Sequence, residues 1–130
     1  MIVETSVIVT MIYKEPSAEA CVDAILQAEV TRLSAANLFE AAIVVDSNRD
    51  PILSRRFDEV VADFEIVIEP VTPEQARIAR EAYRDFGKGS GHPAQLNFGD
   101  CFAYALAKAT GEPLLFIGND FGHTDVTPAL

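Results

Sequence analysis

The stretch Met1-Ile-Val-Glu-Thr-Ser-Val-Ile-Val-Thr-Met-Ile-Tyr13 sets the architecture of this chain. Residues 1–4 form a short strand pattern, and Thr5 or Ser6 then offers an N-cap for a helix that runs to about Tyr13. A strand followed at once by a helix is the repeating unit of an α/β protein with a parallel sheet. Glu4, the only charged residue of the stretch, stands where the strand ends.

The same alternation continues along the whole chain. Short β-like patterns alternate with longer helical ones, which predicts an α/β fold with a mainly parallel sheet of four to five short strands. The sequence contains no internal repeat and no linker, so residues 1–130 are expected to form a single domain. The expected strands are residues 1–4, 30–34, 65–69 and 114–118, and the expected helices are 5–13, 17–29, 36–47, 51–63, 73–86 and 97–110.

Local signals mark several helix ends. Ser17 is expected to cap the second helix, and Gly111 is a typical C-terminal stop. The pattern Thr72-Pro-Glu-Gln75 is a capping box with proline at the first helical position. The helix that it starts is predicted to carry an apolar stripe made of Ala76, Ala79, Tyr83 and Phe86.

Bulk composition restricts the class of protein. The chain has 130 residues, 49% of them hydrophobic, and a net charge of −10. The acidity argues against binding nucleic acid through a broad basic face, but it is compatible with a nuclease whose metal ions neutralise an acidic centre, and it favours a basic protein partner. The longest apolar runs, of about ten residues, fall short of the roughly 20 needed to span a bilayer, and no signal peptide is visible, so no membrane association and a cytoplasmic location are expected.

The two cysteines give no sign of a metal or disulfide site. Cys21 and Cys101 are far apart in sequence, lie among apolar neighbours and belong to no CxxC or Cys/His pattern. They are expected to be reduced, buried core thiols, and a zinc site is not expected.

Four carboxylates stand in apolar surroundings with no basic residue in their own segments. An isolated buried carboxylate is costly, and it is normally paired, neutralised or bound to a metal. Ligands of open α/β sheets sit beyond the carboxyl ends of the strands, and all four acids are expected near that edge. The four residues are Glu4, Glu40, Asp100 and Asp120.

Such a cluster suits magnesium or manganese, which take oxygen ligands and keep several waters. A metal held there can lower the pKa of a bound water, so phosphodiester hydrolysis is the chemistry that fits best. Simpler roles stay open for three members. Asp100 can be a helix cap, Asp120 a turn residue, and Glu40 half of a buried pair with a distant arginine.

The order and spacing of these acids resemble the PIN-domain ribonucleases, and more narrowly the VapC toxins of bacterial toxin–antitoxin pairs. The likeness covers essentially the whole chain. It is carried by the opening Met1-Ile-Val-Glu-Thr-Ser6, by Glu40, by Tyr83-Arg-Asp-Phe-Gly-Lys-Gly89, by Leu96-Asn-Phe-Gly-Asp-Cys-Phe-Ala-Tyr-Ala-Leu-Ala107, and by Pro113-Leu-Leu-Phe-Ile-Gly-Asn-Asp-Phe-Gly-His-Thr-Asp125.

The resemblance implies an α/β/α sandwich, a homodimer and Mg²⁺- or Mn²⁺-dependent cleavage of RNA. It also implies inhibition by a cognate antitoxin whose basic C-terminal segment lies across the active site. By motif position Glu4 and Asp100 are the principal metal ligands, Glu40 and Asp120 complete the cluster, and Asp125 is a further candidate.

One residue departs from the family pattern, which has Asp where this chain has Glu4. The longer side chain moves the carboxylate by about one methylene, and a misplacement of about 1 Å can cost roughly a hundredfold in rate. Two alternatives therefore stay open: an active endoribonuclease toxin, or a catalytically weakened module that still binds an antitoxin. A phosphatase-like hydrolase of small phosphoesters is a third reading, which Glu4 fits poorly as a nucleophile.

A basic stripe and two hydroxyls are further candidates. Thr5 and Ser6 can hydrogen-bond a metal-bound water or a neighbouring acid, or act as helix caps. Basic residues recur at steps of three and four along one helix and can guide an RNA backbone, although a solvated surface stripe paired with nearby glutamates explains them equally well. These residues are Arg77, Arg80, Arg84 and Lys88.

Overall fold

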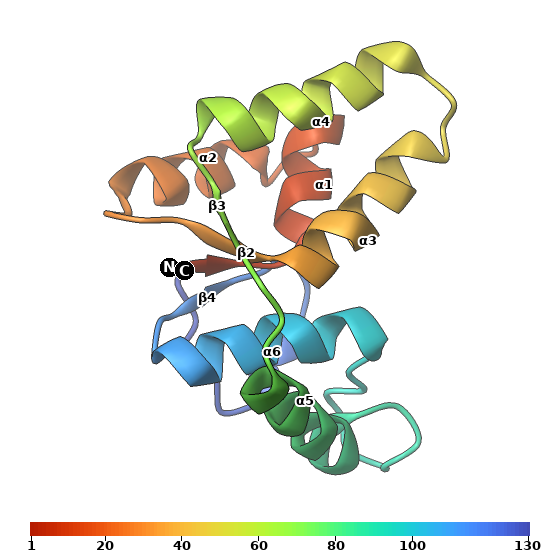
Figure 1. Cartoon of the computed structure of the whole chain (residues 1–130), viewed down its shortest axis with the longest axis vertical. Helices are drawn as coiled ribbons and strands as arrows, with labels where there is room; N and C mark the ends of the chain where they lie inside the picture. The colour runs from red at the N-terminus through yellow and green to blue at the C-terminus, as the bar shows by residue number, and fades with distance from the viewer.

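A computed structural model describes all of residues 1–130 as an α/β protein. Figure 1 shows its elements, which alternate as the sequence predicts. In chain order they are β1 (Ile2–Val3), α1 (Thr5–Tyr13), α2 (Ala18–Gln27), β2 (Arg32–Ser34), α3 (Ala35–Asp46), α4 (Pro51–Asp63), β3 (Val67–Glu69), α5 (Pro73–Phe86), α6 (Phe98–Thr110), β4 (Leu114–Leu115) and the short 3-10 helix η1 (Phe121–His123).

The four strands form one parallel sheet with the order β3-β2-β1-β4. This confirms the predicted parallel sheet of four to five short strands, and it places the first and last strands side by side. The strands are shorter than the apolar patterns that predicted them, because only two or three residues of each pattern pair with a neighbouring strand. Beyond β4 the chain turns at Gly118, whose φ of 102° suits glycine.

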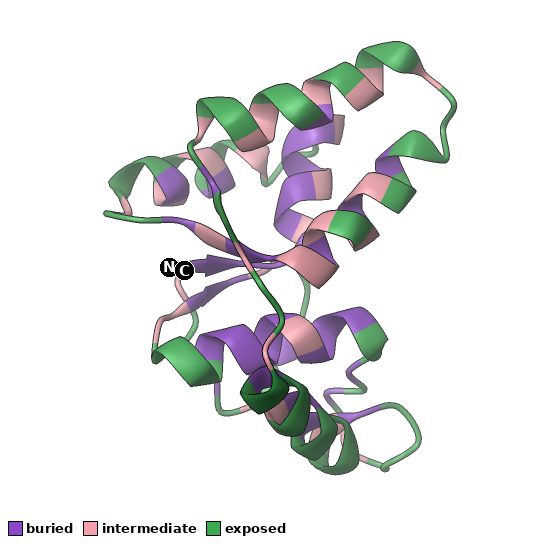
Figure 2. Ribbon diagram, viewed as in Figure 1, coloured by how far each residue is buried: buried purple, intermediate pink, exposed green.

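The sheet separates two hydrophobic cores because side chains alternate along each strand. Ile2 and Leu114 pack against α5 and α6, whereas Val3 and Leu115 pack against α1 to α4. Figure 1 shows these two helical layers on opposite faces of the sheet, and Figure 2 shows burial concentrated along the strands and the inward sides of the helices. The α/β/α sandwich is therefore confirmed.

One predicted N-cap is wrong, and another has the predicted position but not the capping hydrogen bond. The cap of α1 is Glu4, whose side chain accepts a hydrogen bond from the Ser6 N–H, rather than Thr5 or Ser6. The helix begins directly after β1, so the last residue of the strand region occupies the cap position. Ser17 does precede α2, but its side chain makes no capping hydrogen bond because its backbone is already helical.

The predicted apolar stripe of α5 is only partly correct. Ala79 is buried, but Ala76 and Tyr83 are exposed, and the helix instead buries Gln75 and Ala82. The buried face turns towards α6, against which α5 packs. The Thr72 side chain does cap this helix, through the Gln75 N–H.

Polar contacts fix both ends of the strands. At the amino-terminal edge, Arg32 bonds to Glu69 and Glu112, and Glu112 also binds the amine of Met1. At the carboxyl edge, the Ser6 hydroxyl accepts a hydrogen bond of 3.0 Å from the Ile117 N–H. This bond ties the start of α1 to the segment after β4, and so joins two of the segments that carry the predicted acids.

Two other features of the chain concern membranes and thiols. None of the helices is both long enough and apolar enough to cross a membrane. Cys21 and Cys101 are free and buried, as expected.

We expect the sheet centre to dominate stability. Leu33 on β2 is 0% exposed, so Leu33→Ala should lower the free energy of unfolding by about 2–5 kcal/mol. Val67, which pairs near it on the edge strand β3, is 41% exposed, and Val67→Ala should cost less than about 1 kcal/mol. Urea denaturation of both variants checks this, and equal losses would contradict the proposed division between core and edge.

Candidate active site

All four predicted acids line one cavity of about 340 Å³ at the carboxyl ends of β1 and β4. They arrive from four separate parts of the chain: the end of β1, the middle of α3, the first turn of α6 and the segment after β4. The sequence analysis predicted this convergence, and the fold provides it. The other residues that line the cavity are Thr5, Ser6, Val9, Val44, Asn97, Ile117 and Phe121.

Glu4 and Asp100 form the buried part of the cluster. They are 5% and 9% exposed, and each is held by backbone N–H groups at a helix start. The Ser6 N–H donates to the Glu4 carboxylate at 2.8 Å, and the Asn97 N–H donates to the Asp100 carboxylate at 2.9 Å. Asp100 is thus a helix cap as well as a cavity residue, because Asn97 returns the bond in a full capping box.

Glu40 and Asp120 lie nearer to solvent. Glu40 is half-buried, and its carboxylate accepts hydrogen bonds from the Thr5 hydroxyl and, at 3.4 Å, from the Asn37 amide. No arginine pairs with Glu40, so that simpler reading is wrong. Asp120 is exposed just before η1, which corrects the expectation that all four acids are buried.

The two buried carboxylates are electrostatically unfavourable as anions. Burial, with smaller effects from the charges of Asp100 and Glu40, raises the pKa of Glu4 from 4.5 to about 7, although the Ser6 hydrogen bonds oppose the shift. Burial and the charges of Asp120 and Glu40 likewise raise the pKa of Asp100, with Lys88 acting the other way. The cavity is therefore lined by four acidic residues and by no basic residue that would balance their charge.

This donor set fits a hard divalent cation. As the side chains stand, no three acids are gathered closely enough to hold an ion between them alone. Mg²⁺ commonly binds through one or two carboxylates and keeps several waters, so a cavity of this size with separated oxygen ligands is compatible with it. The raised pKa values of Glu4 and Asp100 mark the place where added positive charge would be most stabilising.

Asp125 lies apart from the four acids. Its carboxylate accepts hydrogen bonds from the Tyr104 hydroxyl at 2.6 Å and from Lys108 at 3.0 Å, and it does not line the cavity. These two partners lie in the second and third turns of α6, beyond the first turn that carries Asp100. The structure thus gives Asp125 a tethering role for the C-terminal tail.

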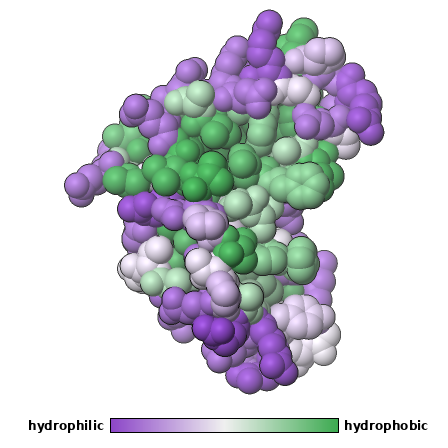
Figure 3. Space-filling view, in the orientation of Figure 1, coloured by the Kyte–Doolittle hydropathy of each residue, from purple (hydrophilic) through white to green (hydrophobic).

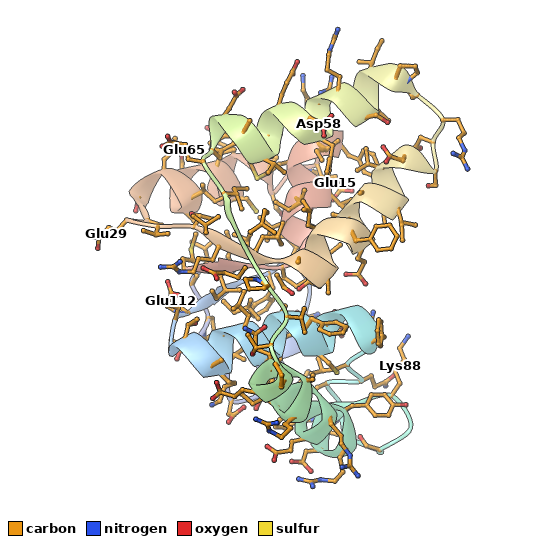
Figure 4. All side chains as sticks on the ribbon, viewed as in Figure 1. Glu15, Glu29, Asp58, Glu65, Lys88 and Glu112 are labelled. Atoms are coloured by element: carbon orange, nitrogen blue, oxygen red, sulfur yellow. The ribbon has the colours of Figure 1, made fainter.

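The basic residues do not form one stripe. The α5 helix ends at Phe86, so Lys88 lies in the following loop. Figure 4 shows Lys88 at the end of the molecule where α6 begins, opposite Glu112. Arg84 pairs with Asp85, whereas Arg80 and Lys88 line a second, apolar hollow of about 540 Å³ between α5 and α6.

Sequence reasoning missed Asn97, which lines both the acidic cavity and the apolar hollow. Its position three residues before Asp100 is a capping-box signal that was available in the sequence. The hollow itself had no such signal, because its walls combine residues of α5 and α6 whose contact depends on packing. These walls include Tyr83, Phe98 and Phe102.

Comparison with known proteins places the whole chain in one family of sequences. A family model described as the PIN domain matches residues 1–126. Ribonuclease VapC28 of Mycobacterium tuberculosis is 58% identical over 130 residues, covering 100% of this chain and 98% of that protein. Ribonuclease VapC42 of the same organism is 47% identical over 129 residues, covering 99% of this chain and 98% of that protein.

Solved structures show the same fold at much lower identity. The chain is similar to M. tuberculosis VapC20, described as a sarcin-ricin loop cleaving toxin, with a TM-score of 0.76 and 15% identity over 97% of this chain and 95% of that one. It is also similar to a chain of a toxin–antitoxin complex from Klebsiella pneumoniae, with a TM-score of 0.71 and 12% identity over 92% and 88% of the two chains.

The raised pKa of Glu4 predicts an unusual dependence of stability on pH when metals are removed. Between its ordinary value of 4.5 and about 7, the folded chain holds a proton that the unfolded chain has lost, so stability falls as pH rises. With EDTA present, we expect the free energy of unfolding to drop by roughly 2–3 kcal/mol from pH 5 to pH 8. Urea titrations at several pH values measure this slope.

The Glu4→Gln variant should flatten most of that slope, because the amide does not titrate. Glu29→Gln is the matched control, since Glu29 is exposed and makes no side-chain hydrogen bond or ion pair. A slope that is unchanged by Glu4→Gln would show that Glu4 is not the group responsible.

Proposed function

Because this chain belongs to the VapC family of PIN-domain ribonucleases, we propose that it is a metal-dependent endoribonuclease and the toxin of a toxin–antitoxin pair. The observation that carries the proposal is the convergence of Glu4, Glu40, Asp100 and Asp120 on one cavity. Four carboxylates with no basic partner in direct contact are costly for a fold that gains nothing from them. A site that binds a divalent cation and hydrolyses phosphodiesters would account for that cost.

Glu4 and Asp100 would hold Mg²⁺ or Mn²⁺, with Glu40 and Asp120 completing the ligand set from the more open side. A divalent ion bound there supplies Lewis-acid stabilisation of phosphate charge and a water of lowered pKa. Near neutral pH Glu4 retains much of its proton, so the binding of a cation would release it. The Thr5 hydroxyl orients the Glu40 carboxylate by donating to it.

RNA would reach the acids past the loop that carries Lys88. This side chain is close enough to Asp100 to lower the pKa of its carboxyl, so it can also contact the phosphate next to the cleaved bond. Asn97 offers an amide on the same side of the cavity. Hydrolysis would form a bond between the oxygen of water and phosphorus and break one P–O bond of the RNA backbone. The sugar oxygen released from phosphorus would take up a proton. Arg80 lines the same hollow as Lys88 and can extend this contact, whereas Arg84 is paired with Asp85 and Arg77 does not line the hollow.

The alternative is a catalytically weakened module that binds an antitoxin without cutting RNA. Glu4 supports it, because one carboxylate oxygen is already engaged by the Ser6 N–H as a helix cap. The extra methylene relative to Asp changes where the free oxygen can reach. Cleavage of RNA by the unaltered chain, compared with the Glu4→Asp variant, decides between the two.

A basic antitoxin segment fits the same cavity. The net charge of −10 and the four acids favour a partner rich in Arg or Lys, and an inserted basic side chain would balance the charge that raises the pKa of Glu4 and Asp100. Such a segment would compete directly with a metal ion. The free thiols of Cys21 and Cys101 and an RNA substrate both suit a cytoplasmic location.

An apolar face beside the cavity supports the homodimer that we include in the proposal. Phe98 and Phe102 pack edge to face at 4.9 Å and form a ridge between two hollows, one against α5 and one against α3. Phe98 is 80% exposed and Phe39 is 68% exposed. Figure 3 shows apolar side chains extending across this side of the molecule, over β2, β3 and the start of α3.

A ridge with a hollow on each side is the kind of surface that can pair with its own copy about a two-fold axis. A ridge of one copy can fill a hollow of the other, and the second copy repeats the contact in reverse. The charges also match, because Arg80 and Lys88 line the hollow on the α5 side and Glu40 lines the hollow on the α3 side. A second copy of the chain is therefore the occupant that we assign to this face.

We expect the unaltered chain to cleave RNA in the presence of Mn²⁺ and Asp100→Asn to lose activity by a hundredfold or more, on the order expected for a displaced site group. Glu4→Asp tests the departure from the family pattern in the same assay. Asp125→Asn is the matched control. It also replaces a carboxylate by an amide, but at a residue that bonds to Tyr104 of α6 and does not line the cavity.

Four outcomes separate the hypotheses. Cleavage by the unaltered chain makes Glu4 a working residue and supports the nuclease. Cleavage only after Glu4→Asp supports the weakened module. Full metal-dependent activity of Asp100→Asn would sink the proposed site, and hydrolysis of a simple phosphomonoester without action on RNA would favour the phosphatase-like reading.

The dimer predicts a separate result in solution. Phe98→Asp should convert the dimer to a monomer in sedimentation velocity, because the charge falls at the centre of the apolar face. Ile52→Asp is the control: Ile52 is 59% exposed on α4, away from the ridge, and its substitution should leave the dimer intact. A monomeric unaltered chain, or equal behaviour of the two variants, would contradict the assignment.

A further inference from the structure

Glu40 reaches the cavity by passing directly over a glycine of α6. A Cβ atom at Gly99 would lie far inside the 3.0 Å that real Cβ atoms keep, against both carboxylate oxygens and the carboxyl carbon of Glu40. Gly99 is buried in the first turn of α6 and its backbone is helical, so no unusual backbone conformation requires glycine there. The missing side chain is what leaves room for Glu40.

A buried amide fastens the same crossing of α3 and α6. Asn37 is 0% exposed, and its Nδ2 donates to the Gly99 carbonyl at 2.9 Å and to Glu40 Oε1 at 3.4 Å. Its Oδ1 is the one buried side-chain nitrogen or oxygen in the chain without a hydrogen-bond partner. An unsatisfied buried acceptor is unfavourable for stability, so the orientation of Asn37 satisfies Glu40 and the Gly99 carbonyl at the expense of its own oxygen.

Glycine in a helix is also unfavourable compared with alanine, because it loses more conformational freedom on folding. The unpaired oxygen of Asn37 and the glycine at position 99 are therefore both locally unfavourable. Both residues lie next to the Glu40 carboxylate. The N-terminal turn of α6 additionally favours an anion above it through the helix dipole.

We propose that Gly99 is a positioning residue for Glu40: it lets the carboxylate lie against the start of α6 and point into the cavity beside Asp100. The inference rests on the proposed metal-dependent function of that cavity. A methyl group at position 99 would displace the Glu40 carboxylate, which is the free end of a flexible side chain, while leaving the two helices in place.

The test is Gly99→Ala, measured for Mn²⁺ affinity by isothermal titration calorimetry and for thermal stability without metal. We expect Mn²⁺ affinity to fall by about tenfold or more, as when a supporting residue of a metal site is lost. The melting temperature should stay level or rise, because alanine favours the helix. A merely structural role for Gly99 predicts the opposite sign for stability. The control is Gly122→Ala, whose new Cβ would meet no atom within 4 Å.

A double-mutant cycle isolates the contact. Glu40→Asp withdraws the carboxylate by one methylene, so the methyl group of Gly99→Ala then has nothing to displace. We expect Gly99→Ala to weaken Mn²⁺ binding in the Glu40 background and to have no further effect in the Glu40→Asp background. Unchanged affinity in the single variant, or an equal loss in both backgrounds, would overturn the inference.

Failure of the proposed function gives a different result. If the unaltered chain neither binds Mn²⁺ nor cleaves RNA, the metal-dependent nuclease is wrong, whatever Gly99 does. Metal-free crystals of the unaltered chain and of Gly99→Ala then decide the packing question alone. A Glu40 carboxylate that moves off α6 in the variant upholds the positioning role, and one that stays in place refutes it.

Discussion

The burial of carboxylates gathered at the carboxyl edge of a parallel sheet, with repulsion among them added, is the constraint on which this structure depends. Glu4 and Asp100 are both buried, and hydrogen bonds from Ser6 to Glu4 and from Asn97 to Asp100 oppose the rise of their pKa values, with Lys88 also acting on Asp100. The fold tolerates this because both acids stand at helix starts, where backbone N–H groups need acceptors. The caps of α1 and α6 are thus also the centre of the site, and local helix stability is linked to the chemistry.

The same arrangement explains why the supporting residues are small or polar. Thr5 and Asn37 donate hydrogen bonds to the Glu40 carboxylate, and the absence of a side chain at Gly99 leaves the space that this carboxylate occupies. None of these residues contributes a large apolar side chain to the core. The region around the cavity is therefore less stable than it could be, and in return it holds its carboxylates in defined positions. The hydrophobic cores on the two faces of the sheet supply the stability that this edge lacks.

The cavity also borders an exposed apolar surface that includes Phe98 and Phe39. The Phe98 and Phe102 ridge begins at the first turn of α6, one residue before Gly99 and two before Asp100. A partner seated on this ridge would therefore cover the rim of the acidic cavity. Under the proposed function, assembly and access of RNA to the site would both depend on the first turn of α6.

The sequence by itself determined the strand and helix order, the parallel sheet and the four acids, because these depend on periodicity and on charges placed in apolar runs. Tertiary structure decided which acids are buried, that Asp125 joins Tyr104 and Lys108, and that Ala76 and Tyr83 face a hollow rather than the core. It also decided the role of Gly99, which depends on how closely α3 approaches α6. Such contacts join residues far apart in the chain, and their geometry follows from packing of whole helices, which local patterns do not encode.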